Sequence, residues 1–144
     1  MDLTASYPRS PVDRLHGIDH LKRMIDKAKA HNAGTLGEYS YNCPMDQLLL
    51  NHLGLDSEDF ASTVRRLVTD EAIYSELEKR LPDALSPDAK SRFNARYESA
   101  APDTPEKQAY FDSLLQAIDP GRKDIRTWVR LLDLDEKRVV PKIP

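Results

Sequence analysis

AGTLGEYSYNCPMD, residues 33–46, is the segment around which we expect the fold to be organised. A helical pattern runs into it, and Gly34 stands where a C-terminal cap is expected, because glycine adopts the left-handed conformation without steric cost. Pro44 suits the first position of a following helix, where its missing N–H would be unpaired in any case. Cys43 is then the predicted N-cap, and Asp46 can accept the N–H of Cys43 as in a capping box. The segment therefore predicts a loop that joins two helices.

Between the two caps, residues 38–42 are predicted to be extended. Side chains alternate along an extended backbone, so Tyr39, Tyr41 and Cys43 are expected on one side. That side would present two phenols and a thiol at a helix start, where unpaired N–H groups and the helix dipole favour anions and where cysteines become reactive. Plainer interpretations stay open: the tyrosines pack on the core, Cys43 is a small buried apolar residue, and Asp46 is only a cap.

Helix caps and apolar stripes at helical spacing recur along the whole chain. They predict an all-α protein of six to seven short helices, with an extended loop near residues 35–43 and no sheet. The expected helices cover residues 18–32 and 44–53, start near residues 57, 70, 87 and 105, and end with a helix over residues 124–132. We expect a single compact domain over residues 17–134, an N-terminal arm (1–16) and a C-terminal tail (135–144) that is either fastened to the domain or free.

The apolar stripes also indicate which faces of the first two helices are buried. The residues expected to face inward are Ile18, Leu21, Ile25 and Ala28 in the first helix, and Met45, Leu48, Leu49 and Leu53 in the second. On another face of the first helix, Arg23 and Lys27 share a row, and Asp19 stands one turn before Arg23. One interpretation of this row is a salt-bridged surface. The other is that Arg23 and Lys27 reach the loop of residues 39–46 and hold an anion there.

The second interpretation defines a candidate site. The candidate ligand-binding residues are Arg23, Lys27, Thr35, Tyr39, Tyr41 and Asp46. The cations would pair with a carboxylate or phosphate, and the tyrosine and threonine hydroxyls would donate hydrogen bonds. Gly34 and Gly37 would let the backbone approach the ligand closely. Cys43 is the candidate for a catalytic role, as a nucleophile.

We expect no cofactor and no metal site. His16 and His20 have a spacing that can present two metal ligands on one helix face, but Gly17 lies between them, and two solvated histidines at a helix start are the simpler interpretation. The glycines fit neither a phosphate-binding loop nor a dinucleotide fingerprint, and the hydrolase and metalloprotease motifs are missing. Because no general base can be identified, the sequence leaves open whether the protein is an enzyme.

Composition excludes several classes of protein. The chain has 144 residues, of which 40% are hydrophobic and 31% charged, as in a soluble globular domain. One cysteine rules out an internal disulfide and fits a reducing cytoplasm. The start of the chain has no signal-peptide pattern, and no apolar run approaches the length of a membrane span. The net charge of −3, with acidic residues concentrated in residues 32–88, argues against nucleic-acid and membrane-surface binding.

Several short runs of the sequence together form a recognisable pattern. They are RMIDKA (residues 23–28), GTLGEY (34–39) and YNCPMDQ (41–47) in the first half, YPRSP (7–11) near the start, and DIRTW (124–128) with LLDLDE (131–136) near the end. Together they resemble a bacterial family catalogued as domain of unknown function 5069. The resemblance extends over nearly the whole chain and implies a single small helical domain. It implies no activity.

Two functions of different class fit these observations. One is the binding of a small anionic metabolite in a pocket between the first helix and the loop of residues 35–46. The alternative is a non-catalytic helical interaction module or a homodimer, for which the helix content and the apolar residues of the tail are the only support. A pocket that contains Arg23, Tyr39, Tyr41 and Cys43 would favour the first.

Overall fold

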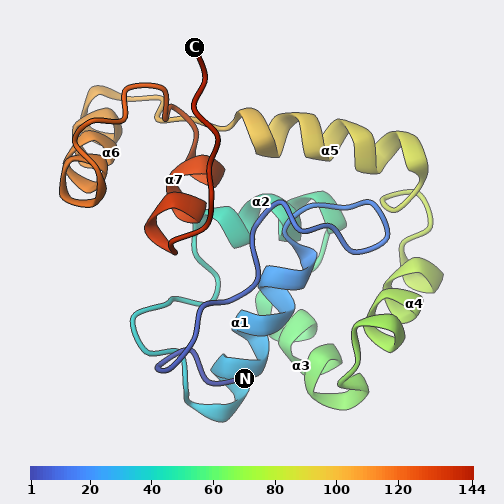
Figure 1. Cartoon of the computed structure of the whole chain (residues 1–144). Coiled ribbons are helices and arrows are strands. Elements are labelled where there is room, and N and C mark those ends of the chain that lie inside the picture. Colours follow the sequence, from blue (N-terminus) through green and yellow to red (C-terminus); the bar gives the residue numbers. More distant parts are fainter. The chain divides into compact units, whose positions relative to one another are not determined.

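The computed structural model describes residues 1–144 and is all-α, as predicted (Figure 1). Its seven helices are α1 (Leu21–Ala33), α2 (Pro44–Leu53), α3 (Ser57–Leu67), α4 (Asp70–Arg80), α5 (Pro87–Ser99), α6 (Pro105–Ile118) and α7 (Trp128–Asp135). The one β-bridge joins Leu15 and Ile18. None of the helices combines the length and the apolar character needed to cross a membrane.

Contacts between residues group the chain into two compact units, Met1–Ala95 and Arg96–Pro144. The boundary between the units falls within α5. The first unit includes the N-terminal arm, and the second unit includes the C-terminal tail. The site predicted from the sequence therefore lies entirely in the first unit.

Cap chemistry fixes most helix starts where the sequence places them. Cys43 is the N-cap of α2, with Pro44 as the first helical residue, and Gly54 closes the helix in the left-handed conformation. The side chains that cap α3, α4 and α6 by accepting a backbone N–H are those of Asp56, Thr69 and Thr104. Gly34 closes α1 as predicted, with φ of 70°.

The start of α1 differs from the prediction. The helix begins at Leu21 and not at residue 18, because Leu15 and Ile18 exchange two backbone hydrogen bonds across a tight turn. His16 and Gly17 form that turn with positive φ. His20, directly before the helix, is also left-handed. His16 and His20 therefore do not share a helix face, and the prediction that both are solvated is wrong for His20, which is fully buried.

Packing in the first unit is centred on α1, which lies against α3, while α3 lies against α4 (Figure 1). The apolar side of α1 is buried as predicted. In α2, however, the buried residues are Asp46, Leu49, Leu50 and Leu53. Leu48, expected to face inward, is 41% exposed. The buried side of α2 includes the Asp46 carboxylate, so the helix is rotated from the orientation that its apolar residues alone predict, and Leu50 is buried in place of Leu48.

The second unit has its own core, made of Phe111, Ile125, Leu131 and Val140. Its last helix begins at Trp128 and not at residue 124, because the Asp124 carboxylate accepts hydrogen bonds from two arginines and from the N–H of Ile143. The hydrogen bond from Arg122, with that of Ile143, holds the pKa of Asp124 well below its usual range. These bonds fasten the C-terminal tail to its unit.

Gly37 has a positive φ of 61°, and the N-terminal arm passes close to it. A Cβ at Gly37 would lie 3.1 Å from the carbonyl oxygen of Leu3, and the N–H of Leu3 donates to Thr35 O at 2.9 Å. The space beside Gly37, where we expected a ligand to approach the backbone, is thus filled by the backbone of the N-terminal arm. At Gly34, φ is 70° but no atom lies within 4 Å of the added Cβ.

These two glycines give a matched test of the arm's position. Gly34→Ala should lower the free energy of unfolding by about 1 kcal/mol, the cost of a left-handed alanine. Gly37→Ala should cost about 1–3 kcal/mol more, because its methyl group also meets Leu3. Urea unfolding followed by far-ultraviolet circular dichroism measures both. Equal losses would contradict the packing of the arm on this loop.

Candidate functional site

Asp46 is fully buried in the first turn of α2 and gathers donors from several segments. Its Oδ1 lies 2.7 Å from Nε2 of His20, and its Oδ2 lies 2.8 Å from Nζ of Lys27. Oδ2 also accepts the backbone N–H groups of Asn42 and Cys43, at 2.9 and 3.1 Å. An ionised carboxylate only accepts hydrogen bonds, so Nε2 of His20 carries a proton. The predicted cap is therefore also the centre of a buried polar cluster.

His20 and Asn42 hold the carboxylate from opposite ends of the segment that includes α1 and the loop after it. Both are non-glycine residues with positive φ, 71° and 75°. Such a conformation costs about 1–3 kcal/mol and persists where the surroundings enforce it, often at functional sites. His20 is further fixed by its own N–H, which donates to Pro11 O at 2.8 Å. Both residues donate hydrogen bonds to Asp46, so the carboxylate holds their backbone in the left-handed conformation.

Lys27 connects the buried carboxylate to the surface. Only 3% of Lys27 is exposed, and besides its bond to Asp46 its ammonium donates to Sγ of Cys43 at 3.1 Å. Cys43 itself is half-buried. Burial of a lysine ammonium is costly unless it is paired and hydrogen-bonded, and both conditions are met here. The predicted salt-bridged surface at this position is wrong, since Lys27 points into the protein.

Residues of the loop between α1 and α2 lie along the side of α1 that carries Arg23 and Lys27. The guanidinium carbon of Arg23 lies 5.7 Å from the ring centroid of half-buried Tyr39, within the range of a cation–π contact. At the other end of the helix the ring of Tyr41 lies 5.0 Å from His31, and its hydroxyl donates to Ser57 O at 2.7 Å. Tyr39 and Cys43 thus face the two cations, and Tyr41 faces α3.

The backbone explains this separation of the two tyrosines. Residues 38–42 are not extended, because one turn includes Gly37 and a second includes Asn42. The first turn is closed by a hydrogen bond from Tyr39 N to Leu36 O at 3.1 Å. The alternation predicted for Tyr39, Tyr41 and Cys43 is therefore lost.

The ionisation of the cluster follows from burial and charge. Burial favours the neutral form of Asp46, but the hydrogen bond from His20 and the charge of Lys27 outweigh it and lower the pKa of the carboxyl well below its usual range. Burial lowers the pKa of His20, and the bond to Asp46 offsets this only in part. At neutral pH the cluster consists of an ionised carboxylate, a charged lysine and a neutral histidine.

A second ionic cluster fastens the N-terminal arm beside the first. Arg9 donates three hydrogen bonds to Asp26, from its backbone N–H, Nε and Nη2, and its Nη1 lies 2.6 Å from Oδ2 of Asp70. The hydrogen bond to Asp70 raises the pKa of Arg9, against the effect of burial. The Arg9 carbonyl in turn accepts a bond from Arg23 at 3.2 Å. The arm thus supports the buried arginine of the candidate site.

The structure brings most of the predicted site residues together. Those that meet along one side of α1 are Arg23, Lys27, Tyr39, Cys43 and Asp46. Thr35 lies apart, with its hydroxyl 2.6 Å from Met1 O and 3.5 Å from Ala30 O. Tyr41 also lies apart, and burial raises the pKa of its hydroxyl. No three histidine, cysteine, aspartate or glutamate side chains come together in a group that could hold a metal ion.

Sequence reasoning missed His20 and Arg9. The signal for His20 was present in α2, where Asp46 occupies the first position of the stripe that continues with Leu49, Leu50 and Leu53. A carboxylate at a core position requires buried donors. The sequence did not say which donors, because His20 is 26 residues away along the chain. Arg9 carried no periodic or capping signal at all.

The site and the fold define a small all-α protein with a buried His–Asp–Lys cluster beside a half-buried cysteine. The chain matches the family model described as Domain of unknown function (DUF5069) over residues 5–138, and it belongs to this family. The resemblance inferred from the sequence is thereby confirmed. A search of curated proteins found no match to the chain.

The burial of Asp46 predicts a large effect of its removal. Asp46→Asn should lower the free energy of unfolding by about 3–5 kcal/mol, because Lys27 is left buried without its counter-charge. The matched control is Asp59→Asn, since Asp59 also lies 2.8 Å from its partner, Arg80, but on the surface. That change should cost about 1 kcal/mol or less. Similar losses in the two variants, measured by urea unfolding, would show that Lys27 is not buried in solution.

His20 predicts a pH dependence of stability. Its pKa in the folded protein is lowered, whereas in the unfolded chain it is about 6.5. Below pH ~6.5 the unfolded chain binds a proton that the folded protein does not, so the free energy of unfolding should fall with pH by up to about 1.4 kcal/mol per unit. Asp46 stays ionised in both states there and adds no slope until about pH 5.

The matched variants for this pH dependence are His20→Gln and His31→Gln. His31 lies at the exposed end of α1. Unfolding curves between pH 7.5 and pH 5 should have a smaller slope than wild type in His20→Gln, and an unchanged slope in His31→Gln. A wild-type slope in His20→Gln would contradict the assignment.

Proposed function

We propose that the protein binds a small anionic metabolite where the loop of residues 34–43 meets α1 and the start of α2. The observation that carries this proposal is the ammonium of Lys27, which is buried against Asp46 and reaches the half-buried thiol of Cys43 at 3.1 Å. A protein that keeps a lysine in such a place bears a desolvation cost that a purely structural apolar residue would avoid.

Charge supports an anion as the ligand. Along this side of α1, Arg23 and Lys27 supply two positive charges, while Asp46 supplies one negative charge and His20 is neutral. Two neighbouring carboxylates, Asp26 and Asp19, are bound by Arg9 and Arg14 respectively. The positive end of the α2 dipole adds to the same potential. An anion beside Cys43 would complete this arrangement.

The contacts of the ligand follow from this geometry. Its carboxylate or phosphate lies at the start of α2, next to Cys43 and within the field of Lys27. Tyr39, whose ring covers the guanidinium of Arg23, forms the adjacent wall. Thr35 and Tyr41 support the loop, because their hydroxyls are bonded to backbone carbonyls. Cys43 contacts the ligand, and a nucleophilic step is not required.

The proposed setting is the cytoplasm of a bacterium. A single thiol, half-buried and without a partner cysteine, is compatible with a reducing compartment.

The competing proposal, a helical interaction module or homodimer, rests on exposed apolar side chains such as Val68, Tyr110 and Val139. These are scattered over both units, and single exposed apolar residues are common on monomers. Light scattering that shows a stable dimer would favour the competing proposal.

The single cysteine offers a direct test of anion binding. Inorganic phosphate, succinate and citrate, added one at a time, should slow the alkylation of Cys43 by iodoacetamide, followed by intact mass spectrometry. A ligand at 100 times its Kd should also raise the free energy of unfolding by about 2.7 kcal/mol, visible as a thermal shift.

Two variants locate the effect. Arg23→Gln should lose at least tenfold in affinity, whereas Lys29→Gln, which removes a charge from the same helix outside the site, should keep it. Protection that persists in Arg23→Gln, or a thermal shift without protection of Cys43, would place the anion elsewhere. Absence of protection and of thermal shift for all three anions and for a wider set of carboxylates and phosphates would refute the proposal.

A further inference from the structure

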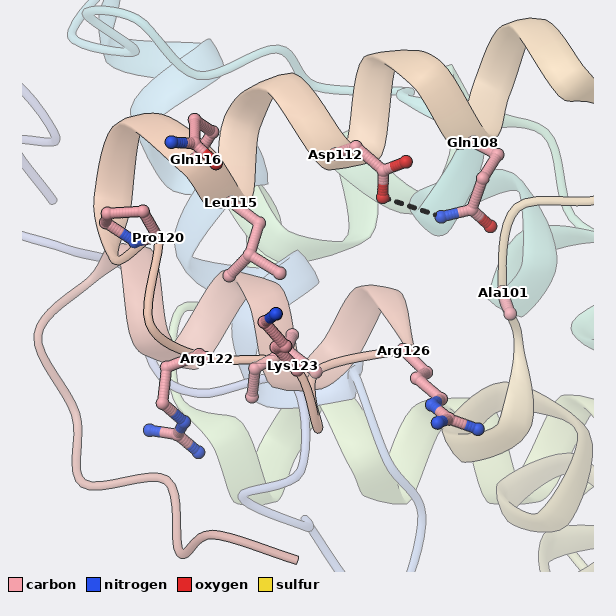
Figure 2. Close-up of a pocket in the computed structure, with 10 residues that line it drawn as sticks. Ala101, Gln108, Asp112, Leu115, Gln116, Pro120, Arg122, Lys123 and Arg126 are labelled. Carbon is pink, nitrogen blue, oxygen red and sulfur yellow. Dashed lines mark hydrogen bonds between the residues drawn. The ribbon is translucent and has the colours of Figure 1, made fainter.

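The second unit contains a cavity of about 530 Å³. It lies between α6 and the segment of residues 120–126, with Ala101 at one end and Pro120 at the other (Figure 2). Its volume is within the range of about 300–1,000 Å³ that is typical of small-molecule sites. The cavity belongs to this unit alone and has no residue in common with the site at Cys43.

The cavity combines an apolar floor with polar walls. Ile125 is buried in the core of the unit and also lines the cavity, and Leu115 of α6 packs against the same core. On α6, Asp112 accepts a hydrogen bond from Gln108 at 2.8 Å (Figure 2). A ligand with an apolar body can therefore bury part of its surface on Leu115 and Ile125.

Two cations of the cavity wall have no partner in the chain. Lys123 and Arg126 are exposed, and neither takes part in an ion pair or hydrogen bond within the chain. Figure 2 shows the side chain of Lys123 turned toward Leu115, with Arg126 at the Ala101 end. Their neighbour Arg122 contrasts with them, because it is buried and bound to Asp124 and to Val140 O. Structure explains Arg122, but it gives Lys123 and Arg126 nothing to bind.

We infer that this cavity binds a small organic anion: an apolar body on Leu115 and Ile125, with a carboxylate that pairs with the cations of the wall, Lys123 and Arg126. The apolar floor selects against bare inorganic ions, and the two free cations select against neutral molecules. Asp112 opposes the anion, since it is the carboxylate of the cavity wall. This site is independent of the proposed function at Cys43, because the two share no residue.

The experiment is a titration of the ¹⁵N-labelled full chain with 4-phenylbutyrate, followed by amide chemical shifts. Saturable shifts are expected in residues 112–126. The neutral 4-phenylbutyramide and inorganic phosphate, which lack the charge and the apolar body respectively, should give none at the same concentrations. Equal shifts with either compound would overturn the inference, as would the absence of shifts with 4-phenylbutyrate.

Charge variants supply the matched controls. The double variant Lys123→Gln/Arg126→Gln should weaken binding at least tenfold, and Asp112→Asn should strengthen it about twofold to fivefold. Lys137→Gln/Lys142→Gln removes the same net charge from exposed positions outside the cavity and should bind as the wild type does. A loss of affinity that is equal in the two double variants would mean that net charge alone drives binding, and it would overturn the inference.

Discussion

A carboxylate without access to water needs donors around it, and Asp46 finds them in three parts of the chain. His20 comes from the turn before α1, Lys27 from the middle of that helix, and two backbone N–H groups from the loop before α2. A buried ion pair of this kind contributes little net stability compared with apolar packing. It does constrain how α1 lies against the start of α2, because His20 and Lys27 must both reach the same carboxylate.

Several features of the first unit follow from this constraint. The left-handed backbone at His20 and Asn42 is held by the bonds that both residues make to Asp46. The exposed position of Leu48 follows from the inward position of Asp46 on the same helix. The half-buried thiol of Cys43 lies at Lys27 because the carboxylate holds the lysine there. The chemistry at the surface is thus set by a group that the solvent does not reach.

Local chemistry was sufficient to predict most of the fold. Caps such as Gly34, Pro44 and Thr104 act through their immediate neighbours, so the helices they bound were predictable to within a residue or two. The start of α1 was not, because it depends on a turn closed between Leu15 and Ile18. The predicted alternation along residues 38–42 failed for a similar reason, since it ignored the turns at Gly37 and Asn42.

The location of the candidate site was predictable from the sequence, but its hydrogen bonds and ion pairs were not. Arg23, Lys27 and Asp46 stood out as charges beside unusual loop chemistry, and the structure brings them to one side of α1. The role of His20 depends on a contact across 26 residues, which no spacing rule reveals. The unpaired cations of the second unit, Lys123 and Arg126, were not predictable either, because a sequence does not distinguish an unpaired surface cation from a paired one.

The coupling between Lys27 and Asp46 tests the central claim most directly. A double-mutant cycle with Lys27→Met, Asp46→Leu and the combined variant measures it as a free energy of unfolding. If the pair is buried and the carboxylate holds the lysine, the two single changes should be non-additive by about 2 kcal/mol or more, with the double variant more stable than the sum predicts. Additivity within about 0.5 kcal/mol would contradict the account.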